Sequence, residues 1–387
     1  MTAAPAQASV DALCANPDFR KAVQRHCMYV DATRLGLLNT RIHPHEPMLT
    51  SARRQTADVN WFVSQYFAVA MQQHGAAQQV MRSVFGPAFA SRTILDFACG
   101  HGRMLRFLAL TVPPRLVWGC DIQRDAVDFV TAEFGVHGLY STANPDEFDA
   151  GRKFEFIWVA SLFSHLPEDL FHRWLAKLVS LLTSDGVLCF TTHNERDITE
   201  GVAMPSSGFY FSTVSENPKL DGSIYGATYV TEAYMRDAVA RLGLASCKTL
   251  RIPRGVAEQE LYVLTSSAEH DLSALSDFRR GARGCLDKID FPAPGALRLQ
   301  GWVGSLDDGA LGQVEIRIDG EPHHAATGVI RNDVARRFGD DRLASAGFDV
   351  HFRVAPASRP LFLEITARTE RDEVAMIYAG PVGPAIA

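Results

Sequence analysis

The sequence lacks several features that would place it in a special class of protein. The sequence has 387 residues, and no apolar run in it comes close to the roughly 18 residues that a membrane-spanning helix needs. Basic residues are not in excess, since 38 Lys and Arg stand against 44 Asp and Glu, for a formal charge of -6. We therefore expect no transmembrane segment and no nucleic-acid partner.

The sequence also lacks the marks of secretion and of a metal site. Its first ten residues contain no basic stretch followed by an apolar one. The seven cysteines are an odd, scattered set without CxxC spacing, which favours reduced thiols and a cytoplasmic location. His43, His45 and Glu46 have ligand side chains, but Pro44 excludes the helical HExxH geometry and no partner cluster lies nearby. We expect a solvated arm there and no metal.

What the sequence does contain is the composition of globular domains, with 47% hydrophobic and 21% charged residues. After Gly86 and Pro87, short apolar runs alternate with segments of helical periodicity. This rhythm predicts an α/β fold with a doubly wound, Rossmann-like parallel sheet. The five expected strands are Thr93–Phe97, Leu116–Cys120, Gly138–Ser141, Phe154–Ala160 and Val187–Thr192.

The segment 194–229 breaks the alternation because it is rich in Gly, Pro, Ser and aromatic residues. A loop of this length inside a compact domain is usually functional, and we predict a lid. After a helix over Thr231–Leu242, the strands Ala245–Ile252 and Glu260–Thr265 predict an antiparallel hairpin at the sheet edge.

The two ends of the chain have patterns of their own. The spacing over Ala57–Phe85 predicts two amphipathic helices broken near Gly75, as an N-terminal helical cap. From about Asp287, alternating apolar and polar residues with Asp-Gly turns predict an all-β sandwich, and Asp271–Cys285 is expected to be a linking helix. The expected domains are an arm and cap at 1–88, the sheet domain at 89–268, a linker helix at 269–289 and a sandwich at 290–387.

The strongest chemical signal is the run from Ile94 to Arg103. An apolar strand there enters small residues and then a helix, so that backbone can approach a ligand at the carboxyl end of the strand. Asp121 ends the next strand, where a carboxylate is suited to a ribose diol. The dinucleotide fingerprint fails, because Leu105 stands where its third glycine belongs. The pattern predicts a nucleoside pocket and disfavours a NAD-dependent oxidoreductase.

With these residues the sequence resembles the class I S-adenosylmethionine-dependent methyltransferases. Asp96, Gly100 and Gly102 align with the family's first motif, and Ala98 stands where that motif has its first glycine. The segment 157–167 resembles the motif at the family's fourth strand, and the edge hairpin also matches. The resemblance implies S-adenosylmethionine as cofactor and S-adenosylhomocysteine as product.

The resemblance also implies roles for single residues. Asp96 is expected to act through the methionine amino group, and Asp121 through the ribose hydroxyls. Ile122 is expected beside the adenine. The small loop residues Ala98, Gly100 and Gly102 are expected to contact the cofactor. Asn144 is a candidate for the adenine edge, and Ala160 and Ser161 would offer backbone groups near the sulfonium.

Two histidines are candidate catalytic residues, because a hydroxyl acceptor must lose a proton. His193 lies at the carboxyl end of the fifth strand, and His165 lies at the equivalent end of the fourth. Each has a structural alternative. His165 would cap the helix beginning at Pro167, and His193 would only hydrogen-bond the lid.

The acceptor is expected to be a small molecule or a glycan. The candidates for holding it are polar and aromatic side chains of the lid, namely Glu195, Tyr210, Glu216 and Tyr225. The alternative is that the segment is a surface loop held in place by its own aromatic residues. The C-terminal segment resembles a β-sandwich module appended to bacterial glycan-modifying enzymes, and it could also serve homo-oligomerisation. We therefore expect O-methylation of a sugar-related acceptor. N- or carboxyl-methylation of another small molecule and a non-catalytic cofactor-binding subunit remain alternatives.

Overall fold

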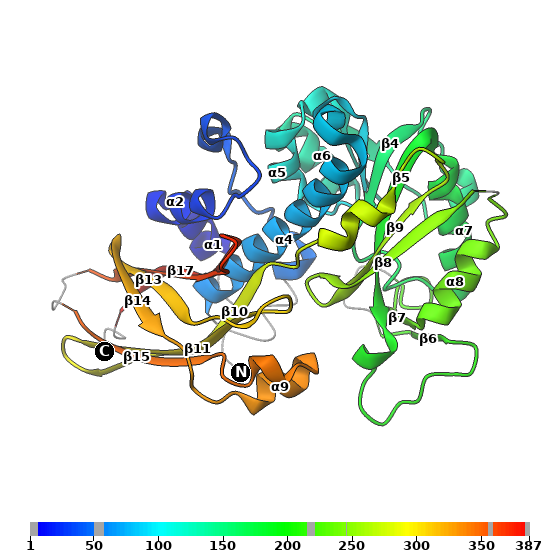
Figure 1. The fold of residues 1–387 in the computed structure, drawn as a ribbon. Helices are drawn as coiled ribbons and strands as arrows, with labels where there is room; N and C mark the ends of the chain where they lie inside the picture. Colours follow the sequence, from blue (N-terminus) through cyan, green and yellow to red (C-terminus); the bar gives the residue numbers. More distant parts are fainter. Residues whose placement is uncertain (1–6, 50–57, 215–220, 245, 355–358, 384–387) are drawn as a thin grey trace. The chain divides into compact units, whose positions relative to one another are not determined.

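The computed structural model describes residues 7–49, 58–214, 221–244, 246–354 and 359–383. Its contacts divide the chain into two units, and one of the boundaries between them falls inside helix α4 (Val59–Phe85), which is labelled in Figure 1. The parallel-sheet unit contains residues 29–39 and 73–278, and the sandwich unit contains residues 1–28, 40–72 and 279–387. These limits differ from those of the expected domains, which remain a proposal.

The parallel-sheet unit has the expected doubly wound core. Five parallel strands lie in the order β3-β2-β1-β4-β5, so the strand order reverses between β1 and β4. In open sheets of this kind ligands bind at the carboxyl ends beside the reversal. The strands are β1 (Ile94–Phe97), β2 (Val117–Asp121), β3 (His137–Tyr140), β4 (Phe154–Val159) and β5 (Leu182–Asn194).

The predicted edge hairpin is confirmed. Strand β9 (Gln259–Thr265) pairs antiparallel with β5 on one side and with β8 (Lys248–Val256) on the other. The pairing aligns Thr191 with Leu261, which brings the start of β9 beside the carboxyl end of β5.

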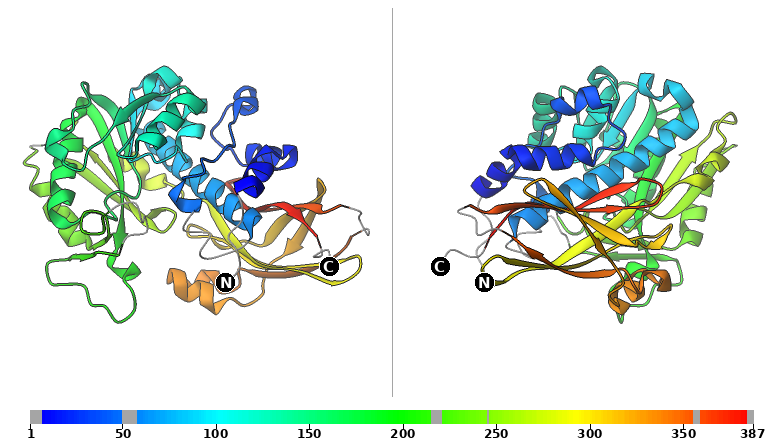
Figure 2. Two further views of the ribbon diagram at one scale, coloured as in Figure 1. Left: turned by 180° about the vertical axis from the view of Figure 1, so that it is seen from behind. Right: turned by 60° about the vertical axis from the view of Figure 1, so that its left-hand side comes forward.

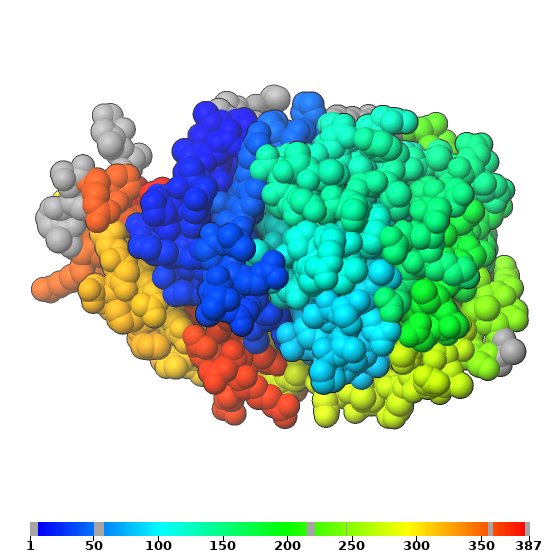
Figure 3. All heavy atoms as spheres, turned by 90° about the horizontal axis from the view of Figure 1, so that it is seen from above, coloured from blue at the N-terminus to red at the C-terminus, as the bar shows by residue number. Residues whose placement is uncertain are grey.

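Both faces of the sheet are covered because alternate strand residues point to opposite sides. Leu95 and Phe97 pack in one apolar cluster with Trp174, whereas Ile94 packs in a second cluster with Leu105. Figure 2 shows the helices from two further sides. They are α5 (Leu105–Thr111), α6 (Arg124–Phe134), α7 (Glu168–Ser180) and α8 (Glu232–Ala240). On the face drawn in Figure 3, the cyan atoms lie directly beside the green ones that follow in sequence.

The prediction of two helices broken near Gly75 is wrong, because α4 runs without interruption. A Cβ at Gly75 would lie 3.2 Å from a ring carbon of Tyr29, so the glycine gives this ring room against the helix. A single glycine inside a helix costs only about 1 kcal/mol. The residue marks a packing contact and not a break.

The segment 194–229 is not a plain loop. Strands β6 (Phe209–Ser212) and β7 (Ala227–Val230) form an antiparallel ribbon, and β7 runs parallel to the end of β5. Phe209 is buried in the same apolar cluster as the first sheet face, which anchors the ribbon to the unit. The expected lid therefore contains regular structure that its turn-rich composition conceals.

The sandwich unit contains two four-stranded sheets that share one apolar cluster. This confirms the predicted all-β sandwich. One sheet contains β10 (Ala282–Ala293), β11 (Ala296–Ser305), β12 (Gly309–Ala310) and β15 (Gly347–Arg353). The other contains β13 (Gln313–Ile318), β14 (Glu321–Ala326), β16 (Leu361–Arg368) and β17 (Val374–Val382). A short helix, α9 (Asn332–Phe338), also belongs to this unit.

Two further expectations differ from the structure. The predicted linking helix is absent over the described residues 271–285, where only a short 3-10 turn (Leu272–Asp277) precedes strand β10. The polar N-terminal arm contains two helices, α1 (Gln7–Ala15) and α2 (Pro17–Arg25), and Arg25 forms an ion pair with the buried Glu364 of β16. Both segments are stabilised by tertiary pairing, which local periodicity does not reveal.

Candidate active site

The candidate residues gather at one edge of the parallel sheet. Strands β2, β1, β4 and β5 are parallel neighbours, so their carboxyl ends lie side by side. Asp96 lies in β1 and Asp121 ends β2, while Ser161 follows β4 and His193 lies near the end of β5. The fold thus places two carboxylates on one half of this edge and an imidazole on the other.

The loop after β1 has a left-handed backbone at three positions. Ala98, Gly100 and Gly102 have φ values of 58°, 52° and 73°. A Cβ on Gly100 would meet no heavy atom within 4 Å, whereas one on Gly102 would lie 2.6 Å from Phe134 and 2.7 Å from Val130. Gly100 therefore leaves open space beside the loop, and Gly102 allows helix α6 to pack against it. Ala98 adopts a conformation that costs an L-residue about 1 kcal/mol, which explains the glycine preferred there.

Two buried carboxylates lie beside this loop. Asp96 is 4% exposed and Asp121 is 6% exposed. Asp121 accepts hydrogen bonds from the backbone nitrogens of Gly100 (2.8 Å) and Gln123 (2.9 Å). Burial raises the pKa of both carboxyls, and the neighbouring charge of Asp121 raises the pKa of Asp96 further. Two carboxylates held close together in a buried site suit a ligand that brings positive charge.

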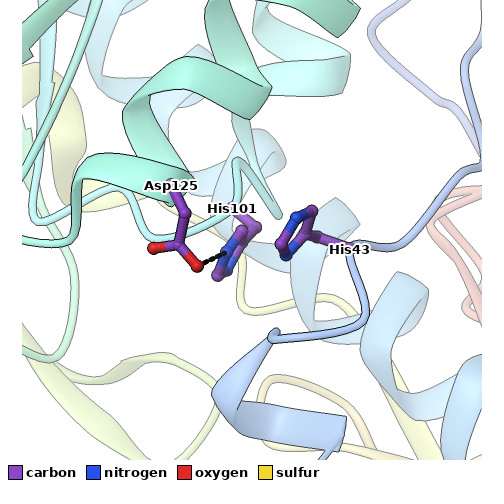
Figure 4. Close-up of side chains that lie close together, drawn as sticks. All are labelled: His43, His101 and Asp125. Atoms are coloured by element: carbon purple, nitrogen blue, oxygen red, sulfur yellow. Dashed lines mark ion pairs between the residues drawn. The ribbon is translucent and has the colours of Figure 1, made fainter. Parts of the chain in front are cut away.

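His101 was not among the expected site residues, although it lies between the two glycines. Its side chain is fully buried, and its Nε2 atom lies 3.9 Å from an Oδ atom of Asp125 at the start of α6 (Figure 4). Its ring also meets Phe129 edge to face. These contacts fix the glycine loop to α6, and the only sequence signal for them is the position inside the motif.

The second half of the edge carries two histidines and the tyrosines of the ribbon. The rings of His165 and His193 lie 6.1 Å apart. His165 stacks on Tyr225 at 4.4 Å and donates from Nδ1 to the carbonyl oxygen of Gly226 at 2.7 Å. His193 packs against Tyr229 at 5.2 Å. Nδ1 of His165 is thus engaged with the ribbon, and the alternative of His165 as a helix cap stays a prediction.

A hydrogen-bond network from strand β9 reaches this half of the edge. The side-chain amide of Gln259 contacts Thr191 (2.6 Å), Ser161 (3.1 Å), His193 (3.1 Å) and Ser164 (3.4 Å). Sequence reasoning missed Gln259, because only the antiparallel pairing of β9 with β5 brings it to the site. The contact with Gln259 also gives His193 a partner outside the ribbon, whereas the alternative had His193 hydrogen-bonding only the lid.

The other expected site residues have simpler surroundings. Asn144 caps a 3-10 turn, accepting from Asp146 N at 3.2 Å, and Ile122 is 40% exposed directly after Asp121. Ala160 follows β4 immediately, at the same edge. Tyr210 lies opposite Tyr229 in the ribbon, and Glu195 is exposed after β5, whereas Glu216 lies outside the described residues.

Residues 94–186 match the protein family described as "Methyltransferase domain". A search of curated protein sequences found no match to the chain. Similar solved structures include CalS10, an amino pentose methyltransferase from Micromonospora echinaspora, at 17% identity and a TM-score of 0.38, covering 50% of this chain and 92% of that one. DesVI from Streptomyces venezuelae is 15% identical with a TM-score of 0.37 and coverages of 50% and 92%. The CcbJ methyltransferase from Streptomyces caelestis is 16% identical with a TM-score of 0.35 and coverages of 51% and 90%.

The family match covers the glycine loop, both carboxylates and the first four strands, and the edge hairpin follows it in the fold. Residues 94–186 are therefore a methyltransferase domain with the class I fold. The chain thus contains a methyltransferase domain, and S-adenosylmethionine is the cofactor that the resemblance in its first motif implies. The resemblance stated from the first motif is thereby confirmed.

The residues present fit such a cofactor. S-adenosylmethionine carries an ammonium and a sulfonium, and Asp96 and Asp121 supply negative charge at a buried position. The open space beside Gly100 gives a ligand access to the loop backbone. Both oxygens of Asp121 accept backbone hydrogen bonds, and a carboxylate has lone pairs for more than one donor on each oxygen. Over the described part of the chain, no helix is both long and apolar enough to cross a bilayer.

Proposed function

We propose that the chain methylates a hydroxyl group of a sugar or glycan-related acceptor. One observation carries this proposal, namely that two imidazoles and three tyrosines gather at the carboxyl ends of β4 and β5, beside the glycine-loop half of the same edge. Flat aromatic rings suit the apolar faces of a sugar, and phenol and imidazole groups suit its hydroxyls.

In this proposal the carboxylate half of the edge binds the cofactor. Asp121 accepts from the ribose hydroxyls and Asp96 holds the amino group, while Ile122 lies against the adenine. Ala98, Gly100 and Gly102 approach the cofactor through the backbone, and Asn144, Ala160 and Ser161 remain candidates for the adenine edge and the sulfonium. The bound cofactor supplies an electrophilic methyl group on a sulfonium sulfur.

The histidine half prepares the acceptor. Methyl transfer is an in-line displacement, so holding the acceptor oxygen in line and excluding water supplies much of the rate. One imidazole of the pair His165 and His193 takes the proton that a hydroxyl loses. The lid residues Tyr210, Tyr225 and Glu195 are the proposed acceptor contacts.

The test is formation of S-adenosylhomocysteine by the purified full chain with a panel of acceptors. We expect turnover with nucleotide sugars, lipid-linked glycans or free saccharides and none with matched amines or carboxylates. Turnover confined to amines or carboxylates would contradict hydroxyl methylation. Binding of both sulfur nucleosides without turnover in a cell extract would indicate a non-catalytic subunit.

A further inference from the structure

Gln259 holds a central position in the histidine half of the edge. It opens strand β9, and its amide lies within hydrogen-bond reach of side chains from the turn after β4 and from β5. Its orientation matters, because the carbonyl end can only accept and the NH2 end can only donate. The hydrogen bonds of the neighbouring hydroxyls determine which end faces His193.

The proton of each neighbouring hydroxyl can be assigned. Ser164 donates to the carbonyl oxygen of Ser161 at 3.0 Å, so its lone pairs face the Gln259 NH2 group at 3.4 Å. Thr191 accepts from the backbone nitrogen of Ser161 at 2.8 Å, which leaves its proton for the Gln259 oxygen. Ser161 is compatible with the same arrangement, since its hydroxyl can donate to that oxygen. The assignments of Ser164 and Thr191 agree on one amide orientation.

The distances agree with that orientation. The 2.6 Å separation between the Thr191 hydroxyl and the Gln259 oxygen suits an O–H···O bond and is short for an N–H···O bond. The 3.1 Å separation between Nε2 of Gln259 and Nε2 of His193 suits an N–H···N bond. The NH2 end of Gln259 therefore faces His193.

A donor at this position fixes the tautomer of His193. Because Gln259 donates to its Nε2, this nitrogen carries the lone pair, and in the neutral ring the proton lies on Nδ1. Adding a proton at Nε2 would place two N–H groups against each other. His193 is thus held as a neutral hydrogen-bond donor.

The opposite assignment applies to His165. Its Nδ1 faces the carbonyl oxygen of Gly226 at 2.7 Å, and a carbonyl oxygen only accepts, so Nδ1 carries the proton. The lone pair of His165 is then on Nε2. The rings of the two histidines are 6.1 Å apart at the same edge, and Nδ1 of His193 is a buried atom.

We propose that Gln259 is a positioning residue that holds His193 neutral as a hydrogen-bond donor, which leaves His165 as the base. The inference rests on the proposed hydroxyl methylation for the role of His165, but not for the tautomer of His193. In the transfer step the acceptor oxygen forms the new C–O bond. The C–S bond of the sulfonium breaks with its electron pair remaining on sulfur, and the acceptor proton moves to Nε2 of His165.

Nitrogen NMR of the full chain labelled with 15N-histidine tests the tautomer without any acceptor. The His193 signals are assigned by their loss in His193→Gln. We expect the Nδ1–H tautomer in the wild type and the Nε2–H or doubly protonated ring in Gln259→Glu, whose carboxylate only accepts. An Nε2–H tautomer of His193 in the wild type would overturn the proposal. Gln300→Glu, which alters a hydrogen-bonded glutamine of the sandwich unit, should leave the His193 signals unchanged.

Kinetics test the division of roles once an acceptor is in hand. We expect His165→Gln to lower kcat by about 100- to 1,000-fold, and His193→Gln and Gln259→Ala by about tenfold, each with unchanged affinity for S-adenosylhomocysteine. Unchanged affinity also shows that the variants fold. A larger loss in His193→Gln than in His165→Gln would overturn the assignment of the base. Turnover of amines alone would contradict the proposed function and leave the NMR result standing.

Discussion

The two halves of the site edge are built on different chemistry. The half at β1 and β2 holds two buried carboxylates and a backbone with left-handed φ values. The half at β4 and β5 holds two imidazoles, tyrosines and a network of hydroxyls around an amide. Charge on one side suits a cationic cofactor, and adjustable donors and acceptors on the other suit a polar acceptor. The comparison implies that cofactor affinity and turnover can be altered separately.

Removing the carboxylate of Asp121, which is proposed to bind the ribose, should have the largest effect, and it should act on cofactor affinity. We expect Asp121→Ala to weaken S-adenosylmethionine binding by about 100- to 1,000-fold, or about 3 to 4 kcal/mol, because two charge-assisted hydrogen bonds are lost. Calorimetric titration measures it. Asp237→Ala, at an exposed position of α8, is the matched control. Equal affinities of the two variants would mean that the carboxylate half does not bind the cofactor.

Substitutions in the glycine loop should change the stability of the cofactor-free protein according to the space around each glycine. Gly102→Ala places a Cβ 2.6 Å from Phe134, and we expect the free energy of unfolding to fall by about 2 to 3 kcal/mol. Gly100→Ala has a similar φ and no atom within 4 Å of the new carbon, so we expect a loss of only about 1 kcal/mol. Denaturant unfolding without cofactor compares the two. A reversed order would contradict the assigned roles.

The buried charge of Asp96 gives a pH-dependent prediction. Burial raises its folded pKa well above the ordinary value of an aspartate, so its contribution to stability is present below about pH 4 and is lost as pH rises through the folded pKa. We expect Asp96→Asn to stabilise the cofactor-free protein at pH 8 by about 1 to 2 kcal/mol while weakening cofactor binding. Urea unfolding at pH 4 and pH 8 measures the difference. A gain as large at pH 4 as at pH 8 would contradict this origin.

The smallest effect is expected at Ala98. A glycine there relieves the left-handed backbone but adds freedom to the unfolded chain, so we expect Ala98→Gly to raise the free energy of unfolding by about 0.5 kcal/mol. Thermal unfolding with and without cofactor checks it. A loss of 1 kcal/mol or more would show that the Ala98 methyl group packs against the loop.

The sequence predicted most of the parallel sheet, because a short apolar run such as Phe154–Val159 indicates a buried strand. It also predicted Asp96, Asp121 and the two glycines as neighbours, because a motif and the parallel order bring them together. The ribbon at Phe209–Ser212 and the role of Gln259 were not predictable in this way. Both depend on pairing between strands that are separated in the chain, and local periodicity does not indicate which strands pair.

The most direct test of the account is a crystal structure of the full chain with S-adenosylhomocysteine. The account predicts the ribose hydroxyls against Asp121, the amino group toward Asp96, and the sulfur directed to the histidine half of the edge. A nucleoside bound elsewhere, or no bound nucleoside at saturating concentration, would contradict the division of the edge into a cofactor half and an acceptor half.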